Sequence, residues 1–312
     1  MKIAIIGAGF AGLATAYFLL ESEGIQVSIF EAHKVGGGAS GVASGLLHPY
    51  PGIMARRSHR GEEALAITKQ LLRVAEAHTS KCVAIHRGIL RQSLTEEQYI
   101  RLCEHCDVWG DIEKIGEDLF LIHSGITVLS ENYLEGLHRA VSEKGGELII
   151  QKIETLDELK SFDHIVIAAG YGMRTFAECQ HLNVKFLKGQ ALQMEGTPPH
   201  DRSFISKGYL AHLGSEKHFE IGSTYEREFQ SDAPDLEIAK KMLGCPEGEI
   251  IRCKAGVRVC NRSHYLPIIE QVADNAHVFT ALGSRGLLYH GLYGRILAQR
   301  IQSITCKEHF YF

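Results

Sequence analysis

The sequence predicts an α/β protein (α+β overall) in which a parallel sheet with helices is joined to a mostly antiparallel sheet. The chain opens with a short apolar run, a glycine-rich turn and a helix-forming stretch over residues 1–24. Buried strand patterns with glycine exits recur at residues 164–172 and 278–286. Between them, segments such as RSFISKGYLAHL, residues 202–213, alternate apolar and polar side chains. That alternation is typical of an antiparallel sheet.

The totals are ordinary for a soluble globular protein. The chain has 312 residues, of which 45% are hydrophobic and 22% charged, enough for two domains or one large domain with an insertion. The formal net charge of −4 does not require a polyanionic partner. Met1 leads directly into a strand pattern rather than a signal peptide, and no apolar run reaches the roughly 18 residues of a spanning helix. We therefore expect a cytoplasmic protein without a membrane partner.

The first fifty residues form a βαβ pattern. KIAIIG reads as a buried parallel strand, AGLATAYFLLESEG as a helix stopping near Gly24, and QVSIFEA as a second strand. In GAGFAG, Gly7 makes the turn, Gly9 lets the backbone approach a pyrophosphate, and Gly12 lets the helix pack on the strands. Glu31 ends the second strand, where an acid accepts hydrogen bonds from ribose hydroxyls. The pattern predicts a dinucleotide site but does not distinguish NAD from FAD.

A second glycine-rich loop, GGGASGVASGLLHPYPG, follows at residues 36–52. Small residues at this density allow a backbone to lie against a flat or charged ligand, and serines and exposed N–H groups can bind phosphate. A mobile linker is the alternative, although such linkers are normally polar throughout, and this loop runs into Leu46-Leu47 and two prolines. We interpret it as an ordered loop that faces a ligand.

GAGFAG, Glu31 and GASGVASG together resemble the opening of the D-amino acid oxidase / glycine oxidase family of flavoproteins. In that family the loop after the ribose acid crosses the FAD diphosphate and borders the flavin ring. The resemblance implies a Rossmann-like FAD-binding domain and a mostly antiparallel substrate domain. His48 follows the small residues of the loop rather than lying among them, so we expect the FAD to be noncovalent. Within the family, the Leu47-His48-Pro49 segment is most similar to the oxidase domain of the bifunctional tRNA 5-methylaminomethyl-2-thiouridine biosynthesis enzyme.

Later segments extend the resemblance along most of the chain, least between residues 60 and 120. HIVIAAGYG resembles the second FAD-contacting strand, LKGQALQME and FEIGSTYE resemble strands of the substrate side, and AGVRVCNRSHYLPIIE resembles a segment that precedes the last FAD-binding turn. The expected acid is replaced within Ser263-His264-Tyr265, and the expected closing glycine is Glu270. The resemblance implies cofactor contacts at Gly7, Gly9, Phe10, Ala11, Gly12, Glu31, Ala39, Ser40, Gly45, Leu46, Ile153, Ala169, Gly170, Gly283, Ser284, Arg285, Gly286 and Leu287.

Two arginines are the candidate catalytic residues. By resemblance Arg285 lies beside the flavin, where it could pair with a substrate carboxylate, and Arg258 is the second candidate. A planar guanidinium binds a carboxylate bidentately. A helix beginning near Gly286 would direct its positive end at the flavin and stabilise negative charge there. The alternative is that both arginines only bind backbone carbonyls or surface acids.

The resemblance also suggests a division into discontinuous domains. Residues 1–55, 130–175 and 250–312 are expected to form the FAD-binding domain. Residues 56–129 and 176–249 are expected to form the substrate domain.

Two other motifs receive less specific interpretations. Cys103 and Cys106 form CEHC, a possible half of a zinc site, but no second pair follows at ligand spacing, so we expect no metal. The basic stretch ARRSHR could be an anion site or a nucleic-acid contact, although a solvated loop before a helix is the usual case. The eight cysteines are scattered, as expected for reduced thiols: Cys82, Cys103, Cys106, Cys179, Cys245, Cys253, Cys260 and Cys306.

The leading functional hypothesis is an enzyme that oxidises a C–N bond of a small-molecule amine, an amino acid or an N-substituted glycine, by hydride transfer to flavin N5 and hydrolysis of the imine. A second hypothesis applies the same chemistry to tRNA, removing the carboxymethyl group of 5-carboxymethylaminomethyluridine. A flavin-binding protein with little catalysis is a third. An NAD-dependent dehydrogenase remains open because the glycine fingerprint is shared.

Overall fold

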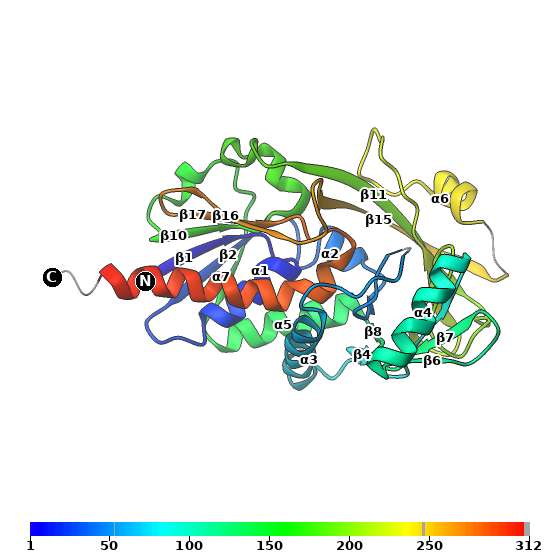
Figure 1. Ribbon diagram of the computed structural model, residues 1–312. Coiled ribbons are helices and arrows are strands. Elements are labelled where there is room, and N and C mark those ends of the chain that lie inside the picture. The colour runs from blue at the N-terminus through cyan, green and yellow to red at the C-terminus, as the bar shows by residue number, and fades with distance from the viewer. Residues whose placement is uncertain (53, 245–246, 309–312) are drawn as a thin grey trace.

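The computed structural model describes residues 1–52, 54–244 and 247–308 (Figure 1). Two large sheets dominate it, one of six strands and one of eight, and a small sheet of three strands accompanies them. The mixed α/β architecture predicted from the sequence is confirmed.

The six-stranded sheet has the order β16-β17-β10-β1-β2-β9. All neighbouring pairs are parallel except β16 and β17. Along β1, Ile3 and Ile5 face one core while Ala4 and Ile6 face the other, which is why this strand reads as a continuous apolar run. The strands are β1 (Lys2–Ile6), β2 (Gln26–Glu31), β9 (Glu147–Ile150), β10 (His164–Ile167), β16 (Ile268–Ala273) and β17 (Ala276–Thr280).

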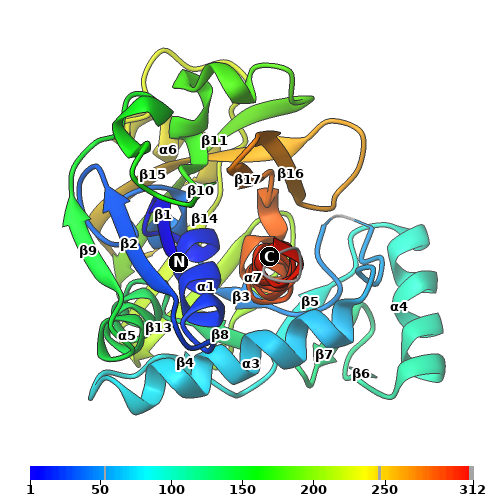
Figure 2. The same cartoon turned by 90° about the vertical axis from the view of Figure 1, so that its left-hand side faces the viewer.

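Four helices cover one face of this sheet, and α1 and α7 lie side by side (Figure 2). Helix α1 ends five residues before Gly24, at Leu19. Its last turn closes when the N–H of Leu20 donates to the carbonyl of Ala16, and Gly24, at φ +76°, instead turns the chain toward β2. The helices are α1 (Phe10–Leu19), α3 (Gly61–Ala77), α5 (Ser130–Glu143) and α7 (Gly286–Glu308). The 3₁₀ turns η1 (Leu156–Leu159), η2 (Gly170–Thr175) and η3 (Ala177–Cys179) lie by the other face.

The eight-stranded sheet has the order β15-β11-β14-β13-β12-β5-β7-β6 and is antiparallel except where β12 meets β5. The strands β11 and β15 are the longest and run from beside the six-stranded sheet toward α6 (Leu236–Leu243) (Figure 1). The strands are β5 (Ile89–Gln92), β6 (Ile112–Lys114), β7 (Leu119–Ile122), β11 (Val184–Glu195), β12 (Phe204–Ile205), β13 (Tyr209–Ser215), β14 (His218–Gly222) and β15 (Glu249–Asn261). Helix α4 (Glu96–Trp109) packs beside β6.

Two elements bear on the expected domain division. Strand β15 pairs with β11 along nearly its whole length, so residues 250–261 belong to the eight-stranded sheet. Helix α3 packs on α5 and α7 in the helical layer of the six-stranded sheet. Both elements lie across the expected domain division, whose boundaries stay a prediction.

The second glycine-rich loop, residues 36–52, folds into helix α2 (Ala39–Val42) and strand β3 (Leu46–Leu47). Strand β3 pairs with β8 (Ile126–Val128), which also pairs with β4 (Ala84–Ile85). At the start of the loop, the N–H of Gly36 donates to the carbonyl of Ala8, 3.0 Å away. The loop is therefore an ordered part of the fold.

We predict that Gly45→Ala destabilises the protein. Gly45 has φ +77°, and an added Cβ would clash with the backbone of Val128, whose N–H donates to the Gly45 carbonyl. Left-handed backbone at a non-glycine residue costs about 1–3 kcal/mol, and the clash adds to it. Urea unfolding of the apoprotein measures the loss, which we expect to be above about 3 kcal/mol. Gly24→Ala is the matched control, because Gly24 has φ +76° but open space around it. Equal losses in the two variants would contradict the proposed clash.

Candidate active site

The candidate site begins where parallel strands end. The carboxyl ends of β1, β2, β10 and β17 lie at one edge of the six-stranded sheet, the usual ligand position in such folds. The turns after β1 and β10 touch each other: a Cβ on Gly7, which has φ +109°, would lie 2.5 Å from the carbonyl oxygen of Ala168. Gly7 also donates its N–H to Phe30 on β2, at 2.8 Å. Three strand ends are thus held together by contacts that a side chain at Gly7 would prevent.

The N-terminus of α1 meets two polar side chains at this edge. One carboxylate oxygen of Glu31 accepts the N–H of Ala8 at 2.9 Å, and the other accepts the N–H of His33 at 3.1 Å. The hydroxyl of Ser40 accepts the N–H of Phe10 at 3.0 Å. A Cβ on Gly9 would lie 2.8 Å from that hydroxyl, so α2 closes directly over the start of α1.

These residues fit a dinucleotide. Backbone N–H groups at a helix N-terminus favour negative charge, and the first turn of α1 carries no acidic side chain to compete with a diphosphate. Glu31 lies at the end of β2. Its carboxylate, which here accepts backbone N–H groups, can instead accept hydrogen bonds from ribose hydroxyls. The chain after β9 also reaches this point, because the N–H of Gln151 donates to the Glu31 carbonyl at 2.9 Å. Ile153, two residues on, is buried beside Phe30 in the second core.

Arg285 lies in the 3₁₀ turn η4 (Gly283–Arg285) before α7, and the next residue, Gly286, adjoins Phe10 at the start of α1. Its side chain is half-buried, and its guanidinium carbon lies 4.2 Å from the ring centre of Tyr265. Burial lowers the pKa of Arg285 from its ordinary value. Within the described part of the chain, no acidic side chain forms an ion pair with it. Its guanidinium can therefore bind an anion from outside.

Arg258 projects from β15 beside the same turn. Its Nη2 donates to the Thr224 carbonyl at 3.4 Å, and its guanidinium carbon lies 6.0 Å from the Tyr225 ring centre. Among residues 1–52, 54–244 and 247–303, no acid pairs with Arg258 either. Two residues further along β15, Cys260 forms a bridge with Leu282, which brings the two arginine-bearing segments together.

A buried arginine that the sequence analysis did not single out holds the end of the glycine-rich loop. Arg91, on β5, is 4% exposed and donates to the carbonyls of Tyr50 and Gly52 at 2.9 and 2.7 Å. Burial lowers the pKa of Arg91 to about 10. Gly52 in turn adjoins Arg285, since a Cβ there would lie 3.9 Å from the Arg285 Nη2. Nothing in the sequence of β5, Ile-Leu-Arg-Gln, indicates that Arg91 is buried, because an arginine in such a strand is usually exposed.

Two buried histidines support the site as neutral groups. Burial, and then the nearby charge of Arg91, lowers the pKa of His48 to about 3, and its Nδ1 accepts the Tyr50 N–H at 3.2 Å. Burial lowers the pKa of His290 to about 4. Its Nδ1 donates to the Leu287 carbonyl at 2.9 Å, and its Nε2 accepts the Tyr133 hydroxyl at 2.6 Å. His290 thereby ties the first turn of α7 to α5.

The other expected cofactor residues lie in the same turns and helix starts. Ala11 and Gly12 are in the first turn of α1, Ala39 is the first residue of α2, and Gly45 and Leu46 enter β3. Ala169 and Gly170 follow β10. Ser284, Gly286 and Leu287 flank Arg285 at the start of α7.

The two secondary motifs have structural roles in the described chain. Arg57 pairs with Glu62 and stacks on Trp109, and Arg60 pairs with Glu63 at 2.7 Å, so most of the basic stretch is neutralised. In CEHC, His105 Nε2 bonds to the Ala55 carbonyl at 2.9 Å. Cys82, Cys103, Cys106, Cys179, Cys253 and Cys260 are free thiols, while Cys245 and the side chain of Cys306 lie outside the described residues. No group of three metal-binding side chains occurs among the residues that could be searched.

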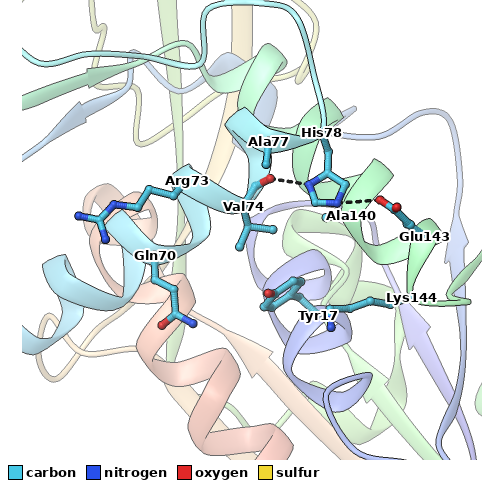
Figure 3. Close-up of a pocket in the computed structure, with 9 residues that line it drawn as sticks. All are labelled: Tyr17, Gln70, Arg73, Val74, Ala77, His78, Ala140, Glu143 and Lys144. Atoms are coloured by element: carbon cyan, nitrogen blue, oxygen red, sulfur yellow. Dashed lines mark hydrogen bonds and ion pairs between the residues drawn. The ribbon is translucent and has the colours of Figure 1, made fainter.

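A groove of about 520 Å³ lies elsewhere, between α1, α3 and α5 (Figure 3). His78 bonds there to Glu143 at 2.8 Å and to the Val74 carbonyl at 2.7 Å. The groove is lined from the last turn of α1, at Tyr17, rather than from its N-terminus, so it is separate from the edge that carries Glu31 and Ser40.

Comparison with known proteins gives a consistent result. The family described as DAO, FAD dependent oxidoreductase, matches residues 2–300. The bifunctional protein MnmC of tRNA 5-methylaminomethyl-2-thiouridine biosynthesis, from Maricaulis maris (strain MCS10), is 24% identical over 96% of this chain and 52% of its own length. The chain thus spans about half the length of that relative. A D-amino acid oxidase from Dugesia ryukyuensis is 23% identical, covering 84% of each chain.

Solved structures share the fold. Glycine oxidase from Bacillus cereus ATCC 14579 superposes with a TM-score of 0.75 at 19% identity, and glycine oxidase from Geobacillus kaustophilus with 0.77 at 17%. Each comparison covers 97% of this chain and 95% of the other. None of the described helices is both long and apolar enough to cross a membrane.

The two neutral histidines predict a loss of stability in acid. The folded pKa values of His48 and His290 lie below the value of about 6.5 expected in the unfolded chain, so the unfolded state binds more protons below pH 6.5. Their contribution to stability is complete above pH 6.5 and is lost as the pH falls toward 4, by about 2.7 kcal/mol per pH unit for two protons. Urea unfolding between pH 7 and pH 4.5 measures it. The His48→Gln variant should lose about half of this slope, and an unchanged slope would contradict the assignment.

Proposed function

Because this chain belongs to the DAO family of FAD-dependent oxidoreductases, we propose that it oxidises the C–N bond of an amino acid or an N-substituted glycine. The observation that carries the proposal is the pair of arginines, Arg285 and Arg258, neither of which has an acidic partner in the described chain. Uncompensated guanidinium groups in a partly buried site are costly unless an anion binds them. A substrate carboxylate would supply that anion.

The residues that hold the cofactor in this proposal are those at the sheet edge. Glu31 would bind the ribose, and the start of α1, with Ser40 over it, would bind the diphosphate. The start of α7, at Gly286, would face the flavin ring with its positive end. FAD, when bound, supplies the two-electron acceptor for the substrate hydride.

The protein's own contribution is orientation. A carboxylate held by a planar guanidinium has few remaining orientations, so the α-carbon can be presented at a fixed distance and angle. Tyr265 covers the face of the Arg285 guanidinium and leaves its edge for the carboxylate. The amine reacts in its neutral form because its lone pair supports departure of the hydride. The resulting imine takes up water and releases the amine and the carbonyl product.

Substitution of Arg285 tests the clamp. Arg285→Met should lower kcat/KM for a carboxylate-bearing amine by roughly 10²–10³, since removing one partner of a desolvated charge pair costs about 2–5 kcal/mol. Anaerobic bleaching of flavin absorbance, followed by stopped flow, gives the rate for glycine, sarcosine and D-amino acids. Arg262→Met is the matched control, because Arg262 lies three residues before Tyr265 but donates to the Val184 carbonyl. If no amine in the panel bleaches the flavin, the protein binds FAD without oxidising amines and the proposal fails.

A second candidate function is the same oxidation on tRNA. It is supported by MnmC of Maricaulis maris, which is similar to this chain over 96% of the chain's length. The substrate would be the N-substituted glycine carried by 5-carboxymethylaminomethyluridine, and its carboxylate would use the same clamp.

Salt dependence tests the tRNA candidate. If tRNA binds through phosphate contacts, the logarithm of its affinity should fall linearly with the logarithm of the salt concentration. We expect gel-shift affinity for modified tRNA to fall at least tenfold between 50 and 200 mM salt. Absence of binding at 50 mM, with activity on free amino acids retained, would leave only the small-molecule function.

A further inference from the structure

A buried ion pair lies beneath the second glycine-rich loop. Lys254 on β15 and Glu220 on β14 approach to 2.5 Å, and their side chains are 6% and 0% exposed. Every second residue of a strand lies on the same face of its sheet, so Lys254 shares a face with Gly256 and Arg258. Glu220 lies on that face too, because Lys254 pairs with Ala191, Ala191 pairs with Gly222, and Glu220 is two residues before Gly222.

That face of the sheet carries the loop. A Cβ on Gly256 would lie 2.9 Å from the Cα of Ala39, so α2 rests directly on β15 between Lys254 and Arg258. On its other side, the loop is held by Ser130, whose hydroxyl donates to the Ala43 carbonyl at 2.9 Å. The loop is therefore enclosed between the first residues of α5 and the sheet.

A buried tyrosine connects the ion pair to the loop. The hydroxyl of Tyr209 donates to the second oxygen of Glu220 at 3.4 Å, and the Ser44 side chain of the loop lies close enough to that hydroxyl to counter the rise in its pKa that burial causes. A cavity of about 160 Å³ is lined on one side by Gly41, Ala43 and Ser44 and on the other by Gln193, Glu220 and Lys254. The pair thus borders the loop through the side chain of Tyr209 and across a shared cavity.

The energetics of such a pair favour a role beyond holding the sheet together. Taking two charges out of water costs several kcal/mol each, and apolar residues of similar volume are often as stabilising or more so. Burial raises the pKa of Glu220 even with Lys254 in contact, in the direction that this cost predicts. The neighbouring positions Ala191, Gly222 and Ala211 are small and apolar, so the sheet does not need the charges for packing.

We propose that Lys254 and Glu220 are positioning residues: their ion pair, through Tyr209 and Ser44, fixes the second glycine-rich loop in the conformation that receives FAD. This rests on the proposed cofactor role of the loop. Glu220 also neutralises Lys254, which leaves Arg258 as the cation of that face available to a substrate.

The decisive variant removes both charges together. Either single neutralisation would leave an unpaired buried charge and could unfold the sheet. Glu220→Gln combined with Lys254→Met removes the ion pair while nearly preserving side-chain volume. Tyr209→Phe removes only the hydroxyl that links Glu220 to Ser44. Tyr17→Phe is the matched control, because Tyr17 is a buried tyrosine on α1 at the separate groove of Figure 3.

We expect the double variant and Tyr209→Phe to raise the Kd for FAD about tenfold or more and to change the bound flavin's visible spectrum, with an unchanged urea midpoint of the apoprotein. Tyr17→Phe should bind FAD like the wild type. Wild-type FAD affinity and spectrum in the double variant would overturn the proposal. So would a loss of stability that alone accounts for the loss of FAD.

Hydrogen exchange separates this inference from the cofactor assignment. In protein stripped of FAD, amides of residues 39–46 should exchange at least tenfold faster in the double variant and in Tyr209→Phe than in the wild type. Amides of β1 and α1 should be unchanged. Equal exchange at residues 39–46 in all variants would show that the pair does not fix the loop, whichever ligand the loop receives.

Discussion

The structure depends on the contact between the second glycine-rich loop and the start of α1. Gly36 reaches the carbonyl of Ala8, and Ser40 reaches the N–H of Phe10. These bonds place a short helix, α2, against β15 of the eight-stranded sheet and against α5 in the helical layer of the six-stranded sheet. The same loop ends at Gly52, held by Arg91 next to Arg285. One segment of the chain therefore sets the distance between the nucleotide end and the substrate end of the candidate site.

Glycine is required in this segment by the backbone itself, apart from any role in ligand binding. Gly41 donates its N–H to the carbonyl of Gly36, and a Cβ there would enter that carbonyl. Gly256, on a distant strand, leaves the space in which Ala39 rests. Substitutions at such positions change the fold and the cofactor site together. FAD retention by a valine variant at Gly45 would therefore not separate a structural role from a binding role, whereas the Tyr209 hydroxyl can be removed without steric conflict.

Local patterns were sufficient to predict the parallel strands, the glycine turns and the membership of an FAD-dependent family. Strand β1 is apolar on both faces and is followed by a turn that requires glycine. Both features can therefore be recognised from residues that are adjacent in the sequence. The contacts of Arg91, Lys254 and Glu220 could not be predicted in this way. Each is a charged residue in an alternating strand, where the sequence alone suggests exposure to solvent. Their partners lie 34 to 41 residues away in the chain, so burial is decided only when the eight-stranded sheet forms.

The difference between the buried cations follows from their partners. Arg91 binds backbone carbonyls and Lys254 binds a carboxylate, so each is committed to holding the chain. The Arg285 guanidinium lies over an aromatic ring, and the Arg258 guanidinium forms one long hydrogen bond to a carbonyl. Both therefore retain N–H donors that can bind an anion. Two buried and two half-buried cations lie near one loop, and those that do not serve the proposed substrate must be neutralised, or an anionic substrate would bind in several orientations. Glu220 performs this neutralisation for Lys254, and in the proposed function the substrate carboxylate is oriented by Arg285 in the turn before α7 and Arg258 on β15.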